Sequence, residues 1–163
     1  MKLRLLFLLL FLIYSSAVFS QINEYNIRKI VLEKNIADSL FVFGSWEKNE
    51  SEFHLKYIGI ITSPEGNYKI ITSVWYWGLS HRATTRILIY SDRNKYLGNY
   101  YLGSVYDIPE KIENDQLVFL HSKSTDCYKK VITRLSFEKG IPKQFFLECK
   151  DGMGDIYMFD KTD

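Results

Sequence analysis

An aromatic cluster, Trp75, Tyr76 and Trp77, lies just before His81 and Arg82 in the sequence. Flat aromatic rings bind the apolar faces of sugars and also bind cations, and a neighbouring His or Arg can hydrogen-bond a hydroxyl or carboxylate group. Packing in the protein core is the alternative, because Trp and Tyr are ordinary residues of β-strands. This stretch is the most suggestive candidate for a ligand-binding surface.

A group of tyrosines follows at the next expected hairpin. Tyrosine side chains contribute contact area at low entropic cost and are favoured at interfaces, whereas a half-exposed aromatic ladder on a sheet is the alternative. If the tyrosines lie at an interface, they would share a surface with the aromatic cluster of residues 75–77. The candidate ligand-binding residues are Trp75, Trp77, His81, Arg82, Tyr100 and Tyr101.

Metal and catalytic chemistry are not indicated by the sequence. His54, His81 and His121 are far apart and lack the spacing typical of metal ligands. Asp151 and Asp155 flank a glycine-rich turn that offers fewer carboxylates than calcium loops usually supply. The sequence also lacks a phosphate-binding glycine motif and a serine in a Gly-flanked nucleophile turn. We therefore expect no catalytic residue, no metal site and no cofactor.

The composition is that of one globular domain. Of the 163 residues, 47% are hydrophobic and 25% are charged, which excludes a disordered chain. Removal of residues 1–20 leaves 19 basic and 19 acidic residues. A net charge near zero provides no general field that would collect nucleic acid or an anionic membrane.

Residues 1–20 have the three parts of a secretory signal peptide. A basic start with Lys2 and Arg4 precedes an apolar run and then a stretch of small residues. The apolar run is shorter than the roughly 20 residues that a membrane-spanning helix needs. We predict cleavage after Ser20, a single mature domain of residues 21–163 without a transmembrane anchor, and a location in the periplasm or outside the cell.

Cys127 and Cys149 are expected to form a disulfide, because disulfides persist in exported proteins. A hairpin that turns at residues 138–140 would place Cys127 opposite Asp151 and make Cys149 its diagonal neighbour on the same face. The alternative is a pair of free or redox-active thiols, but the spacing is not that of a CxxC motif.

The mature chain begins with a helical pattern and continues with strand-like patterns. Residues 21–40 place apolar side chains near one side of a helical wheel, which predicts an amphipathic helix. About eight strands are expected, at residues 53–61, 68–77, 84–90, 96–102, 116–121, 128–137, 143–149 and 155–160. Short connections favour antiparallel neighbours. The predicted fold class is therefore mainly β, an antiparallel meander closed as a small barrel or folded as a sandwich, with one N-terminal α-helix packed against it.

Individual strands carry further signals. The run 68–77 has large side chains on both faces, so it is expected to be central or to place one face in a ligand groove. His54 and Lys56 alternate with the apolar residues of their strand and are expected to face solvent. Gly98 is expected to permit a bend or a bulge.

These features favour a secreted or periplasmic, non-catalytic binding domain that uses an aromatic-rich sheet and loop surface. Its partner would be a glycan, a small molecule or a protein, and not a nucleic acid. The alternative is an inhibitor or immunity-type protein that inserts a loop into a partner enzyme. A small envelope hydrolase is the third hypothesis and has the least support, because the sequence contains no recognisable catalytic constellation.

Overall fold

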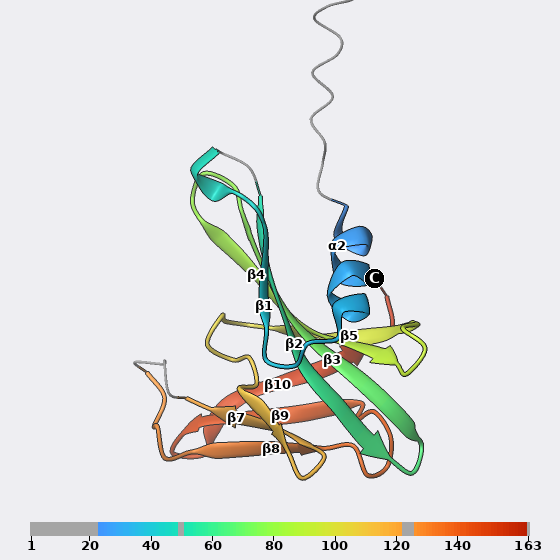
Figure 1. Cartoon of the computed structure of the whole chain (residues 1–163). Helices are drawn as coiled ribbons and strands as arrows, with labels where there is room; N and C mark the ends of the chain where they lie inside the picture. The colour runs from blue at the N-terminus through green and yellow to red at the C-terminus, as the bar shows by residue number, and fades with distance from the viewer. Residues whose placement is uncertain (1–22, 49–50, 122–125, 163) are drawn as a thin grey trace, which may run out of the picture.

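The computed structural model of the chain describes residues 23–48, 51–121 and 126–162, which form two antiparallel sheets and a helix (Figure 1). This arrangement confirms the mainly β fold class with a helix near the N-terminus packed against a sheet. The predicted signal peptide lies outside the described residues. Within the described residues, no helix is long and apolar enough to span a membrane.

The larger sheet has seven strands. Their bounds are β1 Leu40–Gly44, β2 Glu52–Ser63, β3 Gly66–Trp77, β4 Arg82–Ser91, β5 Tyr96–Leu102, β9 Gln144–Lys150 and β10 Met153–Asp160. They lie in the order β1-β2-β3-β4-β5-β10-β9, so β10 returns to pair with β5, where Phe159 is opposite Tyr100. The central position predicted for residues 68–77 is confirmed, since β3 lies between β2 and β4.

The smaller sheet covers one face of the larger one. It consists of β6 Lys111–Glu113, β7 Gln116–Leu120 and β8 Ile132–Ser136 in that order. Phe119 and Phe137 from this side of the molecule are buried together with Tyr100 of the larger sheet in one apolar core. Burying apolar surface on both inner faces is what holds two sheets together as a sandwich.

The helix covers the other face of the larger sheet. α2 spans Glu24–Lys34, begins at Asn23, whose side chain accepts the backbone N–H of Asn26, and ends at Asn35 in the left-handed conformation. Ile27, Val31 and Leu32 are buried in a second core against β2, β3 and β4. The helix is therefore shorter than the predicted range 21–40, because Asn35 ends it and the chain enters β1 at Leu40.

The predicted hairpin around residues 138–140 is wrong. The turn itself forms, since the Gly140 N–H donates a 2.9 Å hydrogen bond to the Phe137 carbonyl oxygen. However, β8 pairs with β7, whereas β9 pairs with β10. The turn therefore carries the chain from the smaller sheet to the larger one, and Cys127 does not take the register opposite Asp151.

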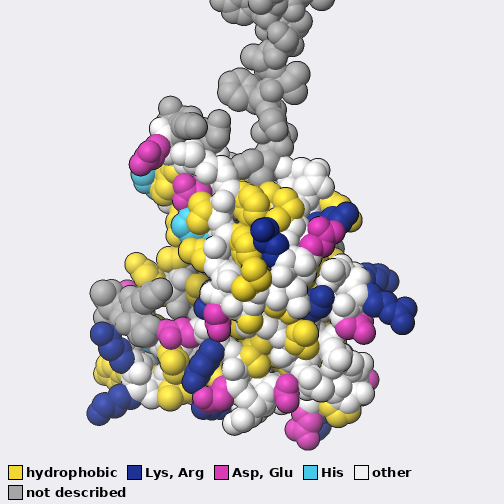
Figure 2. Space-filling model, viewed as in Figure 1, with side chains coloured by type: hydrophobic (Ala, Val, Ile, Leu, Met, Phe, Trp, Pro, Cys, Tyr) yellow, Lys and Arg dark blue, Asp and Glu magenta, His cyan; other side chains and the backbone are white. Residues whose placement is uncertain are grey.

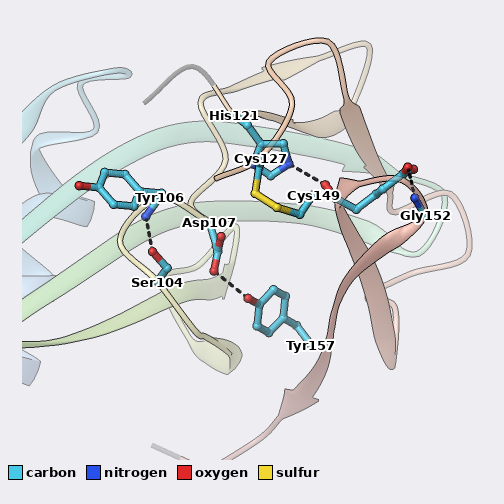
Figure 3. Close-up of a disulfide and its surroundings, with 9 residues drawn as sticks. Ser104, Tyr106, Asp107, His121, Cys127, Cys149, Gly152 and Tyr157 are labelled. Atoms are coloured by element: carbon cyan, nitrogen blue, oxygen red, sulfur yellow. Dashed lines mark hydrogen bonds between the residues drawn. A yellow bond between two sulfur atoms is a disulfide. The ribbon is translucent and has the colours of Figure 1, made fainter. Parts of the chain in front are cut away.

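The predicted disulfide between Cys127 and Cys149 is confirmed, with 4.5 Å between the two Cα atoms (Figure 3). Next to it, the Tyr128 N–H donates a 2.9 Å hydrogen bond to the Cys149 carbonyl oxygen. The ring nitrogen Nε2 of the buried His121 lies 2.6 Å from the Glu148 carbonyl oxygen. The disulfide thus joins the segment before β8 to β9, and therefore joins the two sheets.

Candidate functional site

A half-open groove of about 520 Å³ lies between β1–β3 and residues 105–110, in the connection from β5 to β6. His54, Lys56 and Tyr76 line it from the sheet, and Tyr106 lines it from the connection. Its apolar lining includes Val74, Ile108 and Leu120. A volume of this size lies within the roughly 300–1,000 Å³ typical of small-ligand sites.

Strand alternation places the polar side chains in the groove. His54 pairs with Val74 and Lys56 pairs with Thr72, so all four project from the same face of β2 and β3. The alternating residues of β2, including Leu55, are buried under α2. The expectation that His54 and Lys56 simply face solvent is therefore corrected, because both are half-buried and line the groove.

Two polar side chains of the groove, Lys56 and His54, each contact a carboxylate. The Lys56 ammonium lies 3.0 Å from the Asp38 carboxylate and donates a 3.4 Å hydrogen bond to the carbonyl oxygen of Glu110. At the other end, Nε2 of His54 lies 2.6 Å from Oε1 of Glu52. The Lys56–Asp38 pair joins two different parts of the chain, and the His54–Glu52 pair joins two residues of β2. The two pairs also fix the shape of the groove.

Glu52 organises the end of the groove near Trp46. Its carboxylate contacts the His54 ring and accepts a 3.2 Å hydrogen bond from the Trp46 backbone N–H. Both contacts stabilise the charged form of Glu52 and so lower its pKa. The contact with His54 has the larger effect and the hydrogen bond from Trp46 the smaller. Trp46 belongs to a short 3-10 helix, η1 Trp46–Lys48, which the Glu52 carboxylate thereby anchors.

The ring of Tyr76 contacts two other rings. The Trp46 ring stacks on it with 5.5 Å between centroids, and the His54 ring meets it edge-on at 5.1 Å. Burial is the main cause that raises the pKa of Tyr76, followed by the nearby Glu52 carboxylate and Tyr106 hydroxyl. The rings of Tyr76, Trp46 and His54 therefore form an aromatic cluster at this end of the groove.

The opposite wall is held by hydrogen bonds from β10 (Figure 3). The Tyr157 hydroxyl donates to the Asp107 carboxylate at 2.8 Å and accepts the backbone N–H of Gly103 at 3.3 Å. Within the connection, the Tyr106 N–H donates to Ser104 Oγ at 3.1 Å. Tyr157 therefore positions the segment that brings Tyr106 to the groove.

The sequence-predicted tryptophans lie on the other face of β3 from Tyr76. Trp75 stacks on Phe53 with 5.4 Å between ring centroids, and the Trp75 and Trp77 rings are 6.0 Å apart. The Trp77 indole N–H donates to Thr84 Oγ1 at 3.1 Å, and the Arg82 guanidinium lies 5.6 Å from the Trp77 ring centroid. These three predicted residues, Trp75, Trp77 and Arg82, are therefore neighbours on the helix side of the sheet.

The other three predicted residues are distributed over the molecule. His81 lies in the turn between β3 and β4, has a positive φ of 57°, and its ring contacts that of Trp46. Tyr100 is fully buried in the core between the sheets. Tyr101 points the other way, toward the face of Trp75, Trp77 and Arg82, is 57% exposed and lies under the guanidinium of Arg86. Four of the six predicted residues therefore share the helix side of the sheet, whereas His81 lies in a turn and Tyr100 in the core.

The groove was not predicted as a unit, although the sequence contained one signal for it. The large side chains on both faces of residues 68–77 allowed one face to line a groove, and this is the face of Tyr76. Tyr106 lies in an irregular connection, where no periodicity indicates the direction of a side chain. Pairing between β2 and β3 was needed to place His54 and Lys56 beside it.

Charges on the surface are mixed. On the side shown in Figure 2, acidic and basic side chains are interspersed among apolar ones, and neither sign forms a continuous field. Within the part of the chain that the structure describes, no group of three or more His, Cys, Asp or Glu side chains could hold a metal ion.

The sequence matches no protein-family model, and no curated protein or solved structure matches the chain.

Proposed function

We propose that this protein is a non-catalytic binding domain that holds a small ligand in the groove between β1–β3 and residues 105–110. The observation that carries the proposal is the groove itself, which combines an apolar floor with a few converging polar groups. Non-catalytic binding is favoured because the sequence contains no recognisable catalytic constellation.

We also propose that the domain acts outside the cytoplasm, in the periplasm or beyond the cell. The signal-peptide pattern of residues 1–20 supports this location. The Cys127–Cys149 disulfide supports it independently, since disulfides persist mainly in oxidising compartments. Terminal sequencing of protein recovered from the periplasm and medium of expressing cells tests both points, and a chain that retains residues 1–20 in the cytoplasm would contradict them.

The binding function is tested by NMR with the mature domain and a library of small fragments that includes sugars, amines, carboxylates and nucleosides. We expect fragments to shift the amide signals of β2, β3 and residues 105–110. The Trp77 side of the sheet is an internal control, because it is aromatic but lies outside the groove. Shifts confined to that side, or no shifts at all, would refute the groove as the binding site.

One observation favours a protein partner as a second candidate. Leu79 lies at the tip of the β3–β4 turn and is 89% exposed. The β3–β4 end of the larger sheet extends beyond the rest of the two-sheet body (Figure 1). An exposed apolar side chain on a projecting turn, with Trp77 and Arg82 beside it, suits insertion into a cleft of another protein, as an inhibitor or immunity-type protein requires.

The second candidate is tested by capture of proteins from envelope extracts on the immobilised domain. A partner that is retained by the wild type and lost with Leu79→Asp supports it. Tyr106→Ala is the matched control, because Tyr106 lies in the groove and away from the turn. A partner lost with Tyr106→Ala and kept with Leu79→Asp would place protein binding at the groove instead.

A further inference from the structure

The internal pairing of charges in the groove restricts the chemistry of its ligand. The Lys56 ammonium is engaged by Asp38 and by the Glu110 carbonyl oxygen, and the His54 ring by Glu52. An anionic ligand would compete with Asp38 for Lys56 and with Glu52 for His54, and a cationic ligand would compete with Lys56 for Asp38, so either would lose part of its electrostatic gain to that competition. A neutral ligand can use the remaining hydrogen-bonding capacity of the same groups at no such cost, because ammonium, carboxylate and hydroxyl groups each accommodate several hydrogen bonds.

The walls of the groove suit a ligand with one apolar face and a polar edge. Tyr76 presents an aromatic ring that is backed by Trp46, and Val74 and Ile108 add aliphatic surface. Tyr106 brings a second ring whose residue is 52% exposed. A pyranose ring has this division, with C–H groups on its face and hydroxyl groups around its edge, and aromatic rings bind such faces.

We propose, as a step that rests on the binding function above, that the groove takes a neutral glycan segment. One sugar ring lies with its C–H face on Tyr76, and its hydroxyl groups hydrogen-bond with Lys56, His54 and the Tyr106 hydroxyl. The groove is partly open to solvent, so that a glycan longer than the groove can extend out of it.

The test uses the mature domain in solution and a set of defined oligosaccharides. The neutral probes are tetramers of glucose, mannose, xylose and N-acetylglucosamine, and the anionic probe is a galacturonate tetramer. Binding is measured by calorimetry at low and at high salt. Tyr76→Ala and Tyr106→Ala remove the two groove rings, whereas Tyr101→Ala removes a tyrosine of similar exposure, 57% against 52%, from the opposite face of the sheet.

We expect at least one neutral tetramer to bind with little dependence on salt, and its affinity to fall by about tenfold or more with Tyr106→Ala. Tyr101→Ala should leave the affinity unchanged. Tyr76→Ala removes a half-buried ring, so the fold of this variant is checked by circular dichroism. If the Tyr76→Ala variant fails to fold, Tyr106→Ala decides the outcome.

The proposal is overturned if none of the neutral tetramers binds, if only the galacturonate tetramer binds and salt abolishes it, or if Tyr101→Ala weakens binding as much as Tyr106→Ala. The fragment experiment separates this failure from that of the binding function. Fragments that shift the groove amides while all neutral tetramers fail to bind would reject the glycan and leave the groove as a binding site. Fragments that leave the groove amides unshifted would reject both.

Discussion

The Tyr157 hydroxyl donates a 2.8 Å hydrogen bond to the Asp107 carboxylate, and these two residues are 50 positions apart in the sequence. Tyr157 lies in β10, and its ring is buried in the core at a tilt to the Phe145 ring, with 5.4 Å between the centroids. Asp107 directly follows Tyr106, which lines the groove. A rigid core residue therefore sets the position of one wall of the candidate site.

Replacement of Tyr157 by Phe should loosen that wall. The change removes the hydrogen bonds to Asp107 and from Gly103 and should cost about 1 kcal/mol of stability. Hydrogen exchange should become faster at Gly103 and Tyr106. Tyr100→Phe is the matched control, because it removes a hydrogen bond to the Pro142 carbonyl oxygen in the same core. Faster exchange at Gly103 in both variants, or in neither, would show that Tyr157 does not position the wall.

Gly98 should not tolerate a side chain. A Cβ there would overlap the Asp160 carbonyl oxygen and the Phe159 ring, where β10 pairs with β5. Gly66 has a similar positive φ, 141° against 146°, but a Cβ there would meet nothing within 4 Å. Both Ala variants carry the backbone strain, and only Gly98→Ala adds the overlap. The free energy of unfolding in urea should therefore be lower for Gly98→Ala than for Gly66→Ala by about 1–3 kcal/mol. Equal losses in the two variants would contradict this.

Loss of the disulfide should destabilise the domain without changing its fold. Cys127 and Cys149 are 22 residues apart, and a loop of this length contributes about 3 kcal/mol on the chain-entropy model. The double variant Cys127→Ser and Cys149→Ser should therefore unfold at lower urea concentration, with a far-ultraviolet spectrum like that of the wild type. The wild type under reducing conditions should match the double variant, and a reduced wild type as stable as the oxidised protein would refute the prediction.

Acid should release the end of the groove near Trp46. Hydrogen bonds from His54 and from the Trp46 backbone lower the pKa of Glu52 below its ordinary value of 4.5. A carboxylate whose pKa is lower in the folded state stabilises the fold fully above the unfolded-state pKa, and this contribution disappears as the pH falls through the folded-state pKa. The tryptophan fluorescence should therefore change below pH 4.5. Glu52→Gln should lack this transition, and an unchanged transition in that variant would assign it to another group.

Local sequence patterns predicted the positions of the strands better than they predicted which strands pair with one another. Alternation and turn residues located β2, β3, β4 and β5 to within two residues of their bounds, because each of these signals depends on neighbours in sequence. The turn before Gly140 was also located. Whether the strands on its two sides pair with each other depends on the core. Phe137, which follows β8, and Phe145 of β9 are buried in one cluster, although β8 and β9 belong to different sheets.

The site was less predictable than the fold for the same reason. Trp75 and Trp77 were singled out by residue type, yet the structure divides the aromatic cluster between two faces and leaves only Tyr76 in the groove. Gly98 was expected to permit a bend or a bulge, and the register shifts beside it, since Ile89 is opposite Gly98 but Tyr90 is opposite Tyr96. A groove between a sheet and an irregular connection requires the tertiary placement of residue 106, which no short-range pattern encodes.

The interior place of β10 in the larger sheet has a consequence for biosynthesis. During translation, β1 to β5 emerge first, but the edge of β5 has no partner until residues 153–160 have left the ribosome. β9 also depends on β10, since their pairing attaches β9 to the sheet. The nascent chain therefore cannot complete its inner core until nearly all of the described chain has been made.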